Sequence, residues 1–295
     1  MADRGSVYPY FQFKRIDWDS IHTAYRSRAE AAKGDEIFNV LYDVLAELKD
    51  GHVSLQTQGG SWVSTYIPPR VDKDRHAYSP LVVRKYFDRE LRLAGNQVIE
   101  YEILSGNIGY VCITTLVNEE PVLEGFDAAL EYLKDTKGLI VDVRNNGGGT
   151  DNYSMGIVER LIPSAIDNLP YPLSGGGVHQ GSLMYPRGPF QFTKPVVLLI
   201  NGVCFSACED FAEMMKHVPT VTAVGDTTAG ASGAPQKFSL PSGKKINVST
   251  KDIRRYDGLP IEWNGVTPDI LVPQTEEDIK QGRDKQLEHA IKLLQ

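Results

Sequence analysis

The chain has 295 residues, and a hydrophobic fraction of 41% is enough for the core of one large or two modest domains. Its formal charge of −7 comes from acidic and basic residues mixed along the chain, without the basic stripe that nucleic acid or an anionic membrane would require. No apolar run reaches the roughly 18 residues needed to cross a bilayer. We therefore expect a globular protein with no nucleic-acid partner and no membrane span.

The N-terminus and the cysteines restrict the remaining classes only weakly. The start, MADRGSVYPYF, lacks the basic and apolar regions of a signal peptide, although removal of such a signal would leave a similar start. The three cysteines, Cys112, Cys204 and Cys208, argue against a disulfide framework. Cys204 and Cys208 have no second ligand pair, so we expect neither a metal nor a cofactor.

The N-terminal part of the chain reads as two helices followed by a strand. A helix is predicted over 17–32, and a second over 35–48, with an apolar face and Gly51 as its C′ residue. His52 then leads an alternating strand, HVSLQTQ. Taken alone, His52 is either a hydrogen-bonded structural residue or a general base.

Residues 58–95 predict two or three weak strands and are too few for an independent domain of usual size. Stronger signals follow: a hairpin over 98–116 turned at Asn107-Ile108-Gly109, a helix over 121–135, and the buried strand GLIVDVR. Strand and helix then alternate.

The strand GLIVDVR ends in NNGGGTD, at residues 145–151, before another predicted helix. Three consecutive glycines, Gly147 to Gly149, indicate positive φ or a close backbone approach. The loop lacks the G-x-G-x-x-G pattern and the Lys-Ser/Thr pair of phosphate-binding loops, so we discount a nucleotide site. Its N–H groups could instead form one side of an oxyanion hole.

Residues 195–217, PVVLLINGVCFSACEDFAEMMKH, predict a strand buried on both faces, a short turn and a helix that opens at Ser206. A hydroxyl at a helix N-terminus can cap the helix. It can also be a nucleophile whose oxyanion product is stabilised by free N–H groups and the helix dipole. Position alone leaves both interpretations open.

The C-terminal third predicts a strand over 220–225, a hairpin turned at Pro241-Ser242-Gly243, and a closing helix from Asp284. Glu262 lies between Ile261 and Trp263. A carboxylate in that setting is either a partly buried hydrogen-bonding partner or an edge-strand charge.

Seven motifs in order now resemble one family. They are LKDGHVSL, GNIGYVCI, GLIVDVRNNGGG, PVVLLINGVCFSACEDF, VGDTTAGASG, NGVTPDI and DKQLEHAI. Together they resemble the tail-specific or C-terminal processing serine peptidases, in the branch of the tricorn core and interphotoreceptor retinoid-binding protein. The resemblance covers roughly residues 17–295. It implies an α/β fold with a ββα-spiral core like that of ClpP and crotonase, and an N-terminal helical subdomain.

The resemblance also implies a division of the chain. We expect a helical subdomain over 1–50, a short β-rich region over 51–97 and the peptidase core over 98–295. Many relatives carry a PDZ domain where 58–95 stands here, and that stretch is too short for one. Many bacterial relatives are exported, which favours an exported protein, whereas three unpaired cysteines favour the opposite.

The resemblance places the nucleophile at Ser206 and the oxyanion hole at the N–H groups of Ala207 and Gly148. Relatives with a Ser–Lys dyad carry the lysine twenty-five residues after the serine, where this chain has Ala231. Dyad chemistry would then need Lys237, which we do not expect to substitute. The tricorn-like branch implies instead His52 as general base and Glu262 as the carboxylate that orients it.

Three hypotheses follow from the sequence. The first is an endopeptidase that cleaves unstructured or C-terminal polypeptide segments, bound as an added strand, through an acyl-enzyme on Ser206. The second is a non-catalytic module that binds a peptide or a hydrophobic ligand, against which the intact set of Ser206, His52 and Glu262 argues. The third is a hydrolase of small acyl substrates on the same scaffold.

Overall fold

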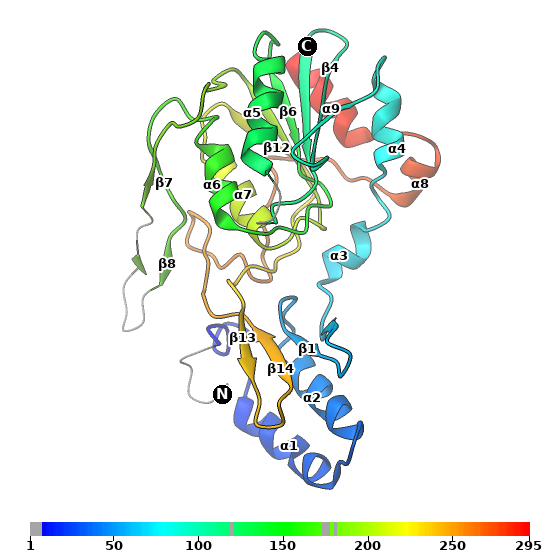
Figure 1. Cartoon of the computed structure of the whole chain (residues 1–295), viewed down its shortest axis with the longest axis vertical. Coiled ribbons are helices and arrows are strands. Elements are labelled where there is room, and N and C mark those ends of the chain that lie inside the picture. The colour runs from blue at the N-terminus through cyan, green and yellow to red at the C-terminus, as the bar shows by residue number, and fades with distance from the viewer. Residues whose placement is uncertain (1–7, 118–120, 173–177, 180–181) are drawn as a thin grey trace.

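The computed structural model describes residues 8–117, 121–172, 178–179 and 182–295. Within them the chain forms two lobes, one above the other along the long axis (Figure 1). The large lobe is built on a seven-stranded sheet, and the small lobe on a four-stranded sheet with two helices. The fold is therefore mixed α/β.

The seven-stranded sheet is parallel in the middle and antiparallel at one end. Its strands, in spatial order, are β15 (Ile270–Leu271), β12 (Val221–Gly225), β11 (Val196–Ile200), β6 (Leu139–Asp142), β5 (Ile108–Ile113), β4 (Ile99–Leu104) and β3 (Arg92–Ala94). The first five run parallel, whereas β4 pairs antiparallel with β5 and with β3. Because the parallel strands end at the same edge, the loops after β6 and β11 meet there.

The two faces of this sheet are covered by different helices, as the alternation of side chains along each strand requires. Val141 and Leu198 face the core formed with α5 (Val122–Leu133), α6 (Asp151–Val158) and α7 (Ala207–Lys216). The alternate residues Ile140 and Leu199 face α9 (Lys285–Leu294). Every residue of β6 and β11 is buried, which confirms the predicted strands.

A buried arginine ties α9 to the sheet. Arg144, just after β6, pairs with Asp142 and with Asp284, whose carboxylate also accepts from the Leu287 N–H and so caps α9. The predicted start of the closing helix at Asp284 is therefore confirmed. Because Arg144 has no solvent-exposed side-chain surface, the end of the chain is fixed to the core through a charged group.

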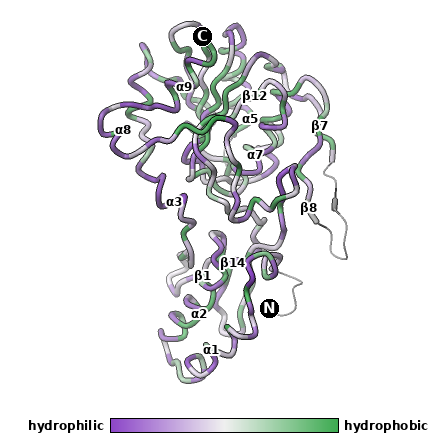
Figure 2. Tube along the Cα trace, turned by 180° about the vertical axis from the view of Figure 1, so that it is seen from behind, coloured by the Kyte–Doolittle hydropathy of each residue, from purple (hydrophilic) through white to green (hydrophobic). Residues whose placement is uncertain are grey.

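The small lobe combines two stretches that lie far apart in the sequence. Its sheet has the order β13 (Gln236–Ser239), β14 (Lys245–Val248), β1 (Ser54–Gln56), β2 (Trp62–Ser64). The helices α1 (Trp18–Ala31) and α2 (Glu36–Ala46) pack beside it (Figure 1). None of the residues of α1 is buried, and the hydropathy colouring is largely polar along it (Figure 2).

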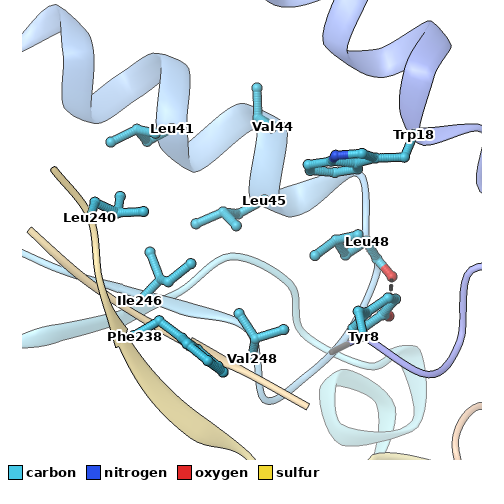
Figure 3. A pocket seen from close by; sticks show the side chains of 10 residues that line it. All are labelled: Tyr8, Trp18, Leu41, Val44, Leu45, Leu48, Phe238, Leu240, Ile246 and Val248. Carbon is cyan, nitrogen blue, oxygen red and sulfur yellow. Dashed lines mark hydrogen bonds between the residues drawn. The ribbon is translucent and has the colours of Figure 1, made fainter. Parts of the chain in front are cut away.

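An apolar cavity of about 160 Å³ lies between α2 and the β13–β14 hairpin (Figure 3). Its walls include Trp18, Leu45, Phe238 and Ile246, and the Tyr8 ring closes one end. The Tyr8 hydroxyl donates to the Leu48 carbonyl, as the dashed line in Figure 3 marks. The small lobe thus contains an unfilled apolar space, unlike the well-filled interior expected of a core.

Two local predictions for the N-terminal half differ from the structure. The α2 helix does not end on Gly51, because the left-handed residue is Lys49, with φ 46°. Residues 58–95 hold the strands β2 and β3 but also three short helices that their composition did not predict: α3 (Pro69–Asp74), α4 (Pro80–Val83) and the 3₁₀ turn Arg84–Tyr86. Two of these helices begin at prolines that suit a first helical turn.

The remaining short elements are β7 (Ile166–Asp167), β8 (Tyr171–Pro172), β9 (Val178–His179), β10 (Leu183–Met184) and α8 (Glu276–Lys280). No helix in the described ranges is long and apolar enough to cross a membrane.

Candidate active site

Ser206 lies at the carboxyl edge of the large sheet, between β11 and α7. Its backbone has φ 57° and ψ −132°, a strained conformation for a residue other than glycine. Two hydrogen bonds hold it, from the Ser206 N–H to the Ala231 carbonyl and from the Phe205 N–H to the Asn146 carbonyl. Its side chain makes no capping hydrogen bond to α7, so the hydroxyl is not used as a helix cap.

The glycine loop after β6 lies directly against Ser206. Gly148 has φ +87°, and a Cβ on it would lie 2.5 Å from the Phe205 carbonyl oxygen and 2.9 Å from both the Ala207 nitrogen and the Ser206 Cβ. The structure thus brings Ser206, Ala207 and Gly148 together, as the sequence predicts. The Gly148 N–H donates to Asn146 Oδ1 at 2.8 Å, so an oxyanion would have to share or replace that acceptor.

A buried carboxylate organises the loop on the other side of Ser206. Glu209, in the first turn of α7, accepts hydrogen bonds from the Thr228 hydroxyl and from the N–H groups of Gly230 and Ala231. Burial raises the pKa of Glu209 to about 7, against the lowering by these three donors. Glu209 therefore fixes Ala231, whose carbonyl in turn fixes Ser206.

His52 lies next to this strained turn but is not connected to it by a hydrogen bond. Its ring centroid is 4.7 Å from that of Phe205, the residue before Ser206. Among the described residues neither ring nitrogen has a hydrogen-bond partner, although only 9% of the residue is exposed. Burial lowers the pKa of His52, and the negative charge of Asp50 opposes that shift. A neutral imidazole is the form that a general base requires.

Glu262 is held by a lysine that the sequence did not single out. Lys14 Nζ lies 2.5 Å from Glu262 Oε1 and also donates to the Tyr8 hydroxyl and to the carbonyls of Leu48 and Lys49. Both side chains are buried, and the ammonium group lies over the rings of Tyr8, Tyr10 and Trp263. Lys14, Glu262 and these neighbours form what we call the Lys14 cluster.

Asp50 completes the Lys14 cluster on the side of His52. Asp50 Oδ1 accepts from the His52 backbone N–H at 2.8 Å, and Oδ2 lies 3.9 Å from Lys14 Nζ. Burial, followed by the negative charge of Asp50, raises the pKa of Glu262 well above its usual range, although Lys14 opposes the shift. Asp50 is thus the carboxylate whose negative charge opposes the lowering of the His52 pKa. Glu262 instead forms the ion pair with Lys14.

The chain has no lysine at the position that a Ser–Lys dyad would require. Ala231 is fully buried, and its backbone contacts Ser206. Lys237 lies on β13, where its ammonium group is 5.7 Å from the centre of the Trp62 ring. Lys237 thus belongs to the small-lobe sheet, whereas Ser206 lies at the edge of the large sheet.

Three residues of the site, Asp50, Glu209 and Lys14, were not predicted from the sequence. Asp50 and Glu209 lie inside the motifs LKDGHVSL and PVVLLINGVCFSACEDF, close to His52 and Ser206, and that closeness in the sequence is a signal that could identify them. Lys14 had no such signal, because a lone lysine in YFQFKRI is ordinarily a surface residue. The described residues contain no group of His, Cys, Asp and Glu side chains suited to a metal, and all three cysteines are free and buried.

Two curated proteins that resemble this chain are proteases. Tricorn protease homolog 1 of Streptomyces coelicolor is 26% identical over 94% of this chain and 33% of its own length. The carboxy-terminal processing protease CtpB of Bacillus subtilis is also 26% identical, over 85% of this chain and 52% of its own length. The chain therefore spans about a third to a half of these relatives.

Solved structures share the fold. A putative peptidase from Parabacteroides merdae is 29% identical, with a TM-score of 0.84 over 98% of this chain and 92% of that one. Mature CPAF, at 14% identity, has a TM-score of 0.69 over 98% and 94% of the two chains and shows the fold alone. A profile described as Peptidase family S41 matches residues 107–272, more than half of the chain. The chain therefore belongs to peptidase family S41.

Proposed function

We propose that this protein is a serine endopeptidase that cleaves unstructured or C-terminal polypeptide segments through an acyl-enzyme on Ser206. The observation that carries the proposal is the strained backbone of Ser206 at the start of α7, packed against Gly148 with its hydroxyl free of any capping role. Strain of this kind is kept where the surrounding structure and the function require it. We also propose that the large lobe is the ββα-spiral core of this family.

In the proposed reaction, Ser206 Oγ attacks the carbonyl carbon of the scissile bond and its proton passes to His52. The oxyanion receives hydrogen bonds from the N–H groups of Ala207 and Gly148. The Ala207 amide begins α7 and so has no acceptor within the helix. His52 then gives its proton to the leaving amine, and a water molecule, deprotonated by His52, releases the acyl group.

The hydrogen bond between the His52 ring and the Ser206 hydroxyl would have to form when substrate binds. Both ring nitrogens of His52 are buried and have no hydrogen-bond partner among the residues that the structure describes, and the Phe205 ring packs against the imidazole. Catalytic hydrogen bonds are often absent in substrate-free enzymes and form in the complex. Glu262 would then orient His52 indirectly, through Asp50 and the Lys14 cluster, since its own carboxylate is held by Lys14.

Digestion of casein by the purified chain tests the proposal. We expect Ser206→Ala and His52→Ala to lower cleavage by roughly 10⁴-fold, and Ser242→Ala, in the exposed hairpin turn, to leave it unchanged. Equal activity of the wild type and Ser206→Ala would refute the acyl-enzyme. A parallel assay with a small ester separates an endopeptidase from a hydrolase of small acyl groups.

The apolar cavity of the small lobe favours a second candidate function, the binding of a small apolar ligand. Its volume of about 160 Å³ and its lining of aliphatic and aromatic side chains suit one benzene-sized group (Figure 3). Titration with benzene should raise the melting temperature of the wild type. The same titration should leave a Leu45→Phe variant, in which the cavity is filled, unaffected.

A further inference from the structure

The apolar cavity of the small lobe and the Lys14 cluster share two residues, Tyr8 and Leu48. Both line the cavity of about 160 Å³, and Figure 3 shows them side by side at one end of it. Lys14 Nζ donates to the Tyr8 hydroxyl at 2.9 Å and to the Leu48 carbonyl at 3.1 Å, and the hydroxyl itself donates to that carbonyl at 3.2 Å. The wall of the cavity therefore also holds the buried ammonium group.

The Tyr8 hydroxyl stays neutral in this position. Burial, followed by the negative charges of Asp50 and Glu262, raises the pKa of this hydroxyl above its usual range. A neutral hydroxyl can donate one hydrogen bond and accept another at the same time. Tyr8 can therefore bridge the Leu48 carbonyl and the Lys14 ammonium group, which fixes the ring and the cation relative to each other.

A continuous set of buried contacts leads from Lys14 to His52. Lys14 Nζ lies 2.5 Å from Glu262 Oε1 and 3.9 Å from Asp50 Oδ2. Asp50 Oδ1 in turn accepts from the His52 backbone N–H at 2.8 Å. The side chains of Lys14, Asp50 and Glu262 have at most 1% of their surface exposed, so solvent screens their charges only weakly. A displacement of the ammonium group would therefore change the electrostatic environment of His52.

The packing of the Tyr8 ring depends on what fills the cavity. The ring contacts Tyr10 and Phe11 edge-on, at centroid distances of 5.7 and 4.9 Å, but the part of the ring that faces the cavity gains no such dispersion contacts. An apolar molecule in the cavity would supply them while the ring keeps its present position. Its binding therefore favours this position over any in which the hydroxyl leaves Lys14.

We propose that the cavity is an effector site, in which a bound apolar molecule of about the size of benzene stabilises the arrangement of Tyr8 and Lys14 and thereby acts on His52. The ten lining side chains drawn in Figure 3 carry no charged group, and the volume suits one aromatic ring. This inference rests on the proposed function, in which His52 is the base. It goes beyond the binding of an apolar ligand because it couples that binding to the site.

The sign of the coupling follows from the charges that act on His52. Burial is the main cause that lowers the pKa of His52; the negative charge of Asp50 opposes this shift, and the positive charge of Lys14 adds to it. Glu262, the other acid of the cluster, is paired with Lys14. A ligand that keeps Lys14 in place preserves its contribution. With the cavity occupied, His52 should therefore stay neutral, and able to accept a proton, down to a lower pH.

An NMR titration of the histidine rings with and without benzene tests the inference without requiring catalysis. The His52 signal is identified by its loss in a His52→Gln protein. We expect benzene to lower the pH at which His52 titrates, whereas the signals of His217 and His289, in the large lobe, should not respond. A rise in melting temperature on the same addition would show independently that benzene is bound.

Two variants separate the coupling from the binding of benzene. Tyr8→Phe keeps the ring that closes the cavity and removes the hydroxyl that holds Lys14. Benzene should raise its melting temperature as in the wild type but shift the His52 titration much less. Leu45→Phe fills the cavity, so benzene should change neither quantity.

The coupling can also be measured in the opposite direction. Because coupling between two sites is reciprocal, weakening the Lys14 cluster must weaken the binding of benzene. In calorimetric titrations, the Lys14→Met/Glu262→Gln protein should bind benzene about 5-fold more weakly than the wild type. Lys237→Met is the control, since this lysine of the same lobe does not line the cavity, and it should leave the affinity unchanged.

Three results would overturn the inference. The first is that benzene does not bind to the wild type. The second is that it binds but leaves the His52 titration unchanged. The third is a full shift of that titration in Tyr8→Phe, which would show that benzene stabilises the lobe without acting through the hydroxyl.

The casein assay distinguishes failure of this inference from failure of the proposed function. If His52 responds to benzene but the wild type does not cleave casein, the effector site stands and the proposed peptidase is wrong. If the wild type cleaves casein and His52→Ala does not, while benzene leaves the pH dependence of cleavage unchanged, the peptidase stands and the effector site is wrong.

Discussion

The two halves of the candidate site are built differently. The half around Ser206 consists of backbone segments of the large lobe, with Gly148 and Ala231 on either side of the serine. The half around His52 and Glu262 consists of side chains from the N-terminal segment, the turn after α2 and the segment before β15, joined by Lys14. No hydrogen bond from the His52 ring to any described residue joins the two halves.

This difference shows how strain and charge are distributed in the site. The Ser206 half stores a strained backbone conformation that main-chain hydrogen bonds support. The other half buries two carboxylates whose charge one ammonium group offsets, at a high cost if the pairing is lost. The following changes test whether each half depends on the interactions we assign to it.

The largest expected effect is that of Lys14→Met. It leaves Glu262 and Asp50 buried without their cation, so we expect the free energy of unfolding at neutral pH to fall by about 3–5 kcal/mol. The loss should be smaller at acidic pH, where Glu262, whose pKa is already raised by burial, becomes protonated. Urea denaturation at two pH values measures both effects.

The double variant Lys14→Met/Glu262→Gln is the matched control for this change. Removing both charges should recover much of the stability, because no unpaired carboxylate remains at position 262. A double variant as unstable as Lys14→Met alone would show that Lys14 stabilises the protein through packing and not through the ion pair.

The pH dependence of stability tests Glu209 in the Ser206 half. Its folded pKa of about 7 lies above the usual value of 4.5, so the folded state binds more protons between these values. The contribution of Glu209 to the free energy of unfolding is therefore largest below about pH 4.5. It decreases by about 3 kcal/mol as the pH rises to about 7. The difference between wild type and Glu209→Gln, followed by urea unfolding from pH 4 to 8, should show that slope, and a constant difference would contradict it.

Gly148→Ala tests the close packing on the other side of Ser206. The new methyl would meet the Phe205 carbonyl oxygen at 2.5 Å in a backbone of φ +87°. We expect a loss of at least about 2 kcal/mol in stability and a loss of peptidase activity. Gly147→Ala is the control, since a Cβ there meets nothing within 4 Å and its φ is not in the left-handed region. Equal effects of the two variants would contradict the assigned contact.

The smallest effect concerns the position of a pH profile. Because burial lowers the pKa of His52, the acid limb of kcat/KM should lie below pH 6.5, the usual value for histidine. Asp50 opposes that shift, so Asp50→Asn should move the limb to still lower pH. A limb above pH 6.5 would show that another group is the base or that His52 is charged in the free enzyme.

Local patterns were enough for much of the large lobe. The buried runs Leu139–Asp142 and Val196–Ile200 are strands, the hairpin turns at Asn107 with φ 64°, and α7 starts directly after Ser206. The same reasoning missed the helices of 69–86 and placed the end of α2 on the wrong residue, because short amphipathic segments depend on what they pack against.

The sequence by itself determined the order of strands and helices in the core, the glycine loop and the serine at the head of α7. These follow from hydrophobic periodicity and from the backbone freedom of glycine, both of which act over a few neighbouring residues. Only the tertiary structure decided that Lys14 holds Glu262, that Asp50 faces His52, and that Arg70 stands beside Gly230. Those contacts join residues up to 248 positions apart, and their strength comes from burial, which no local pattern of residues encodes.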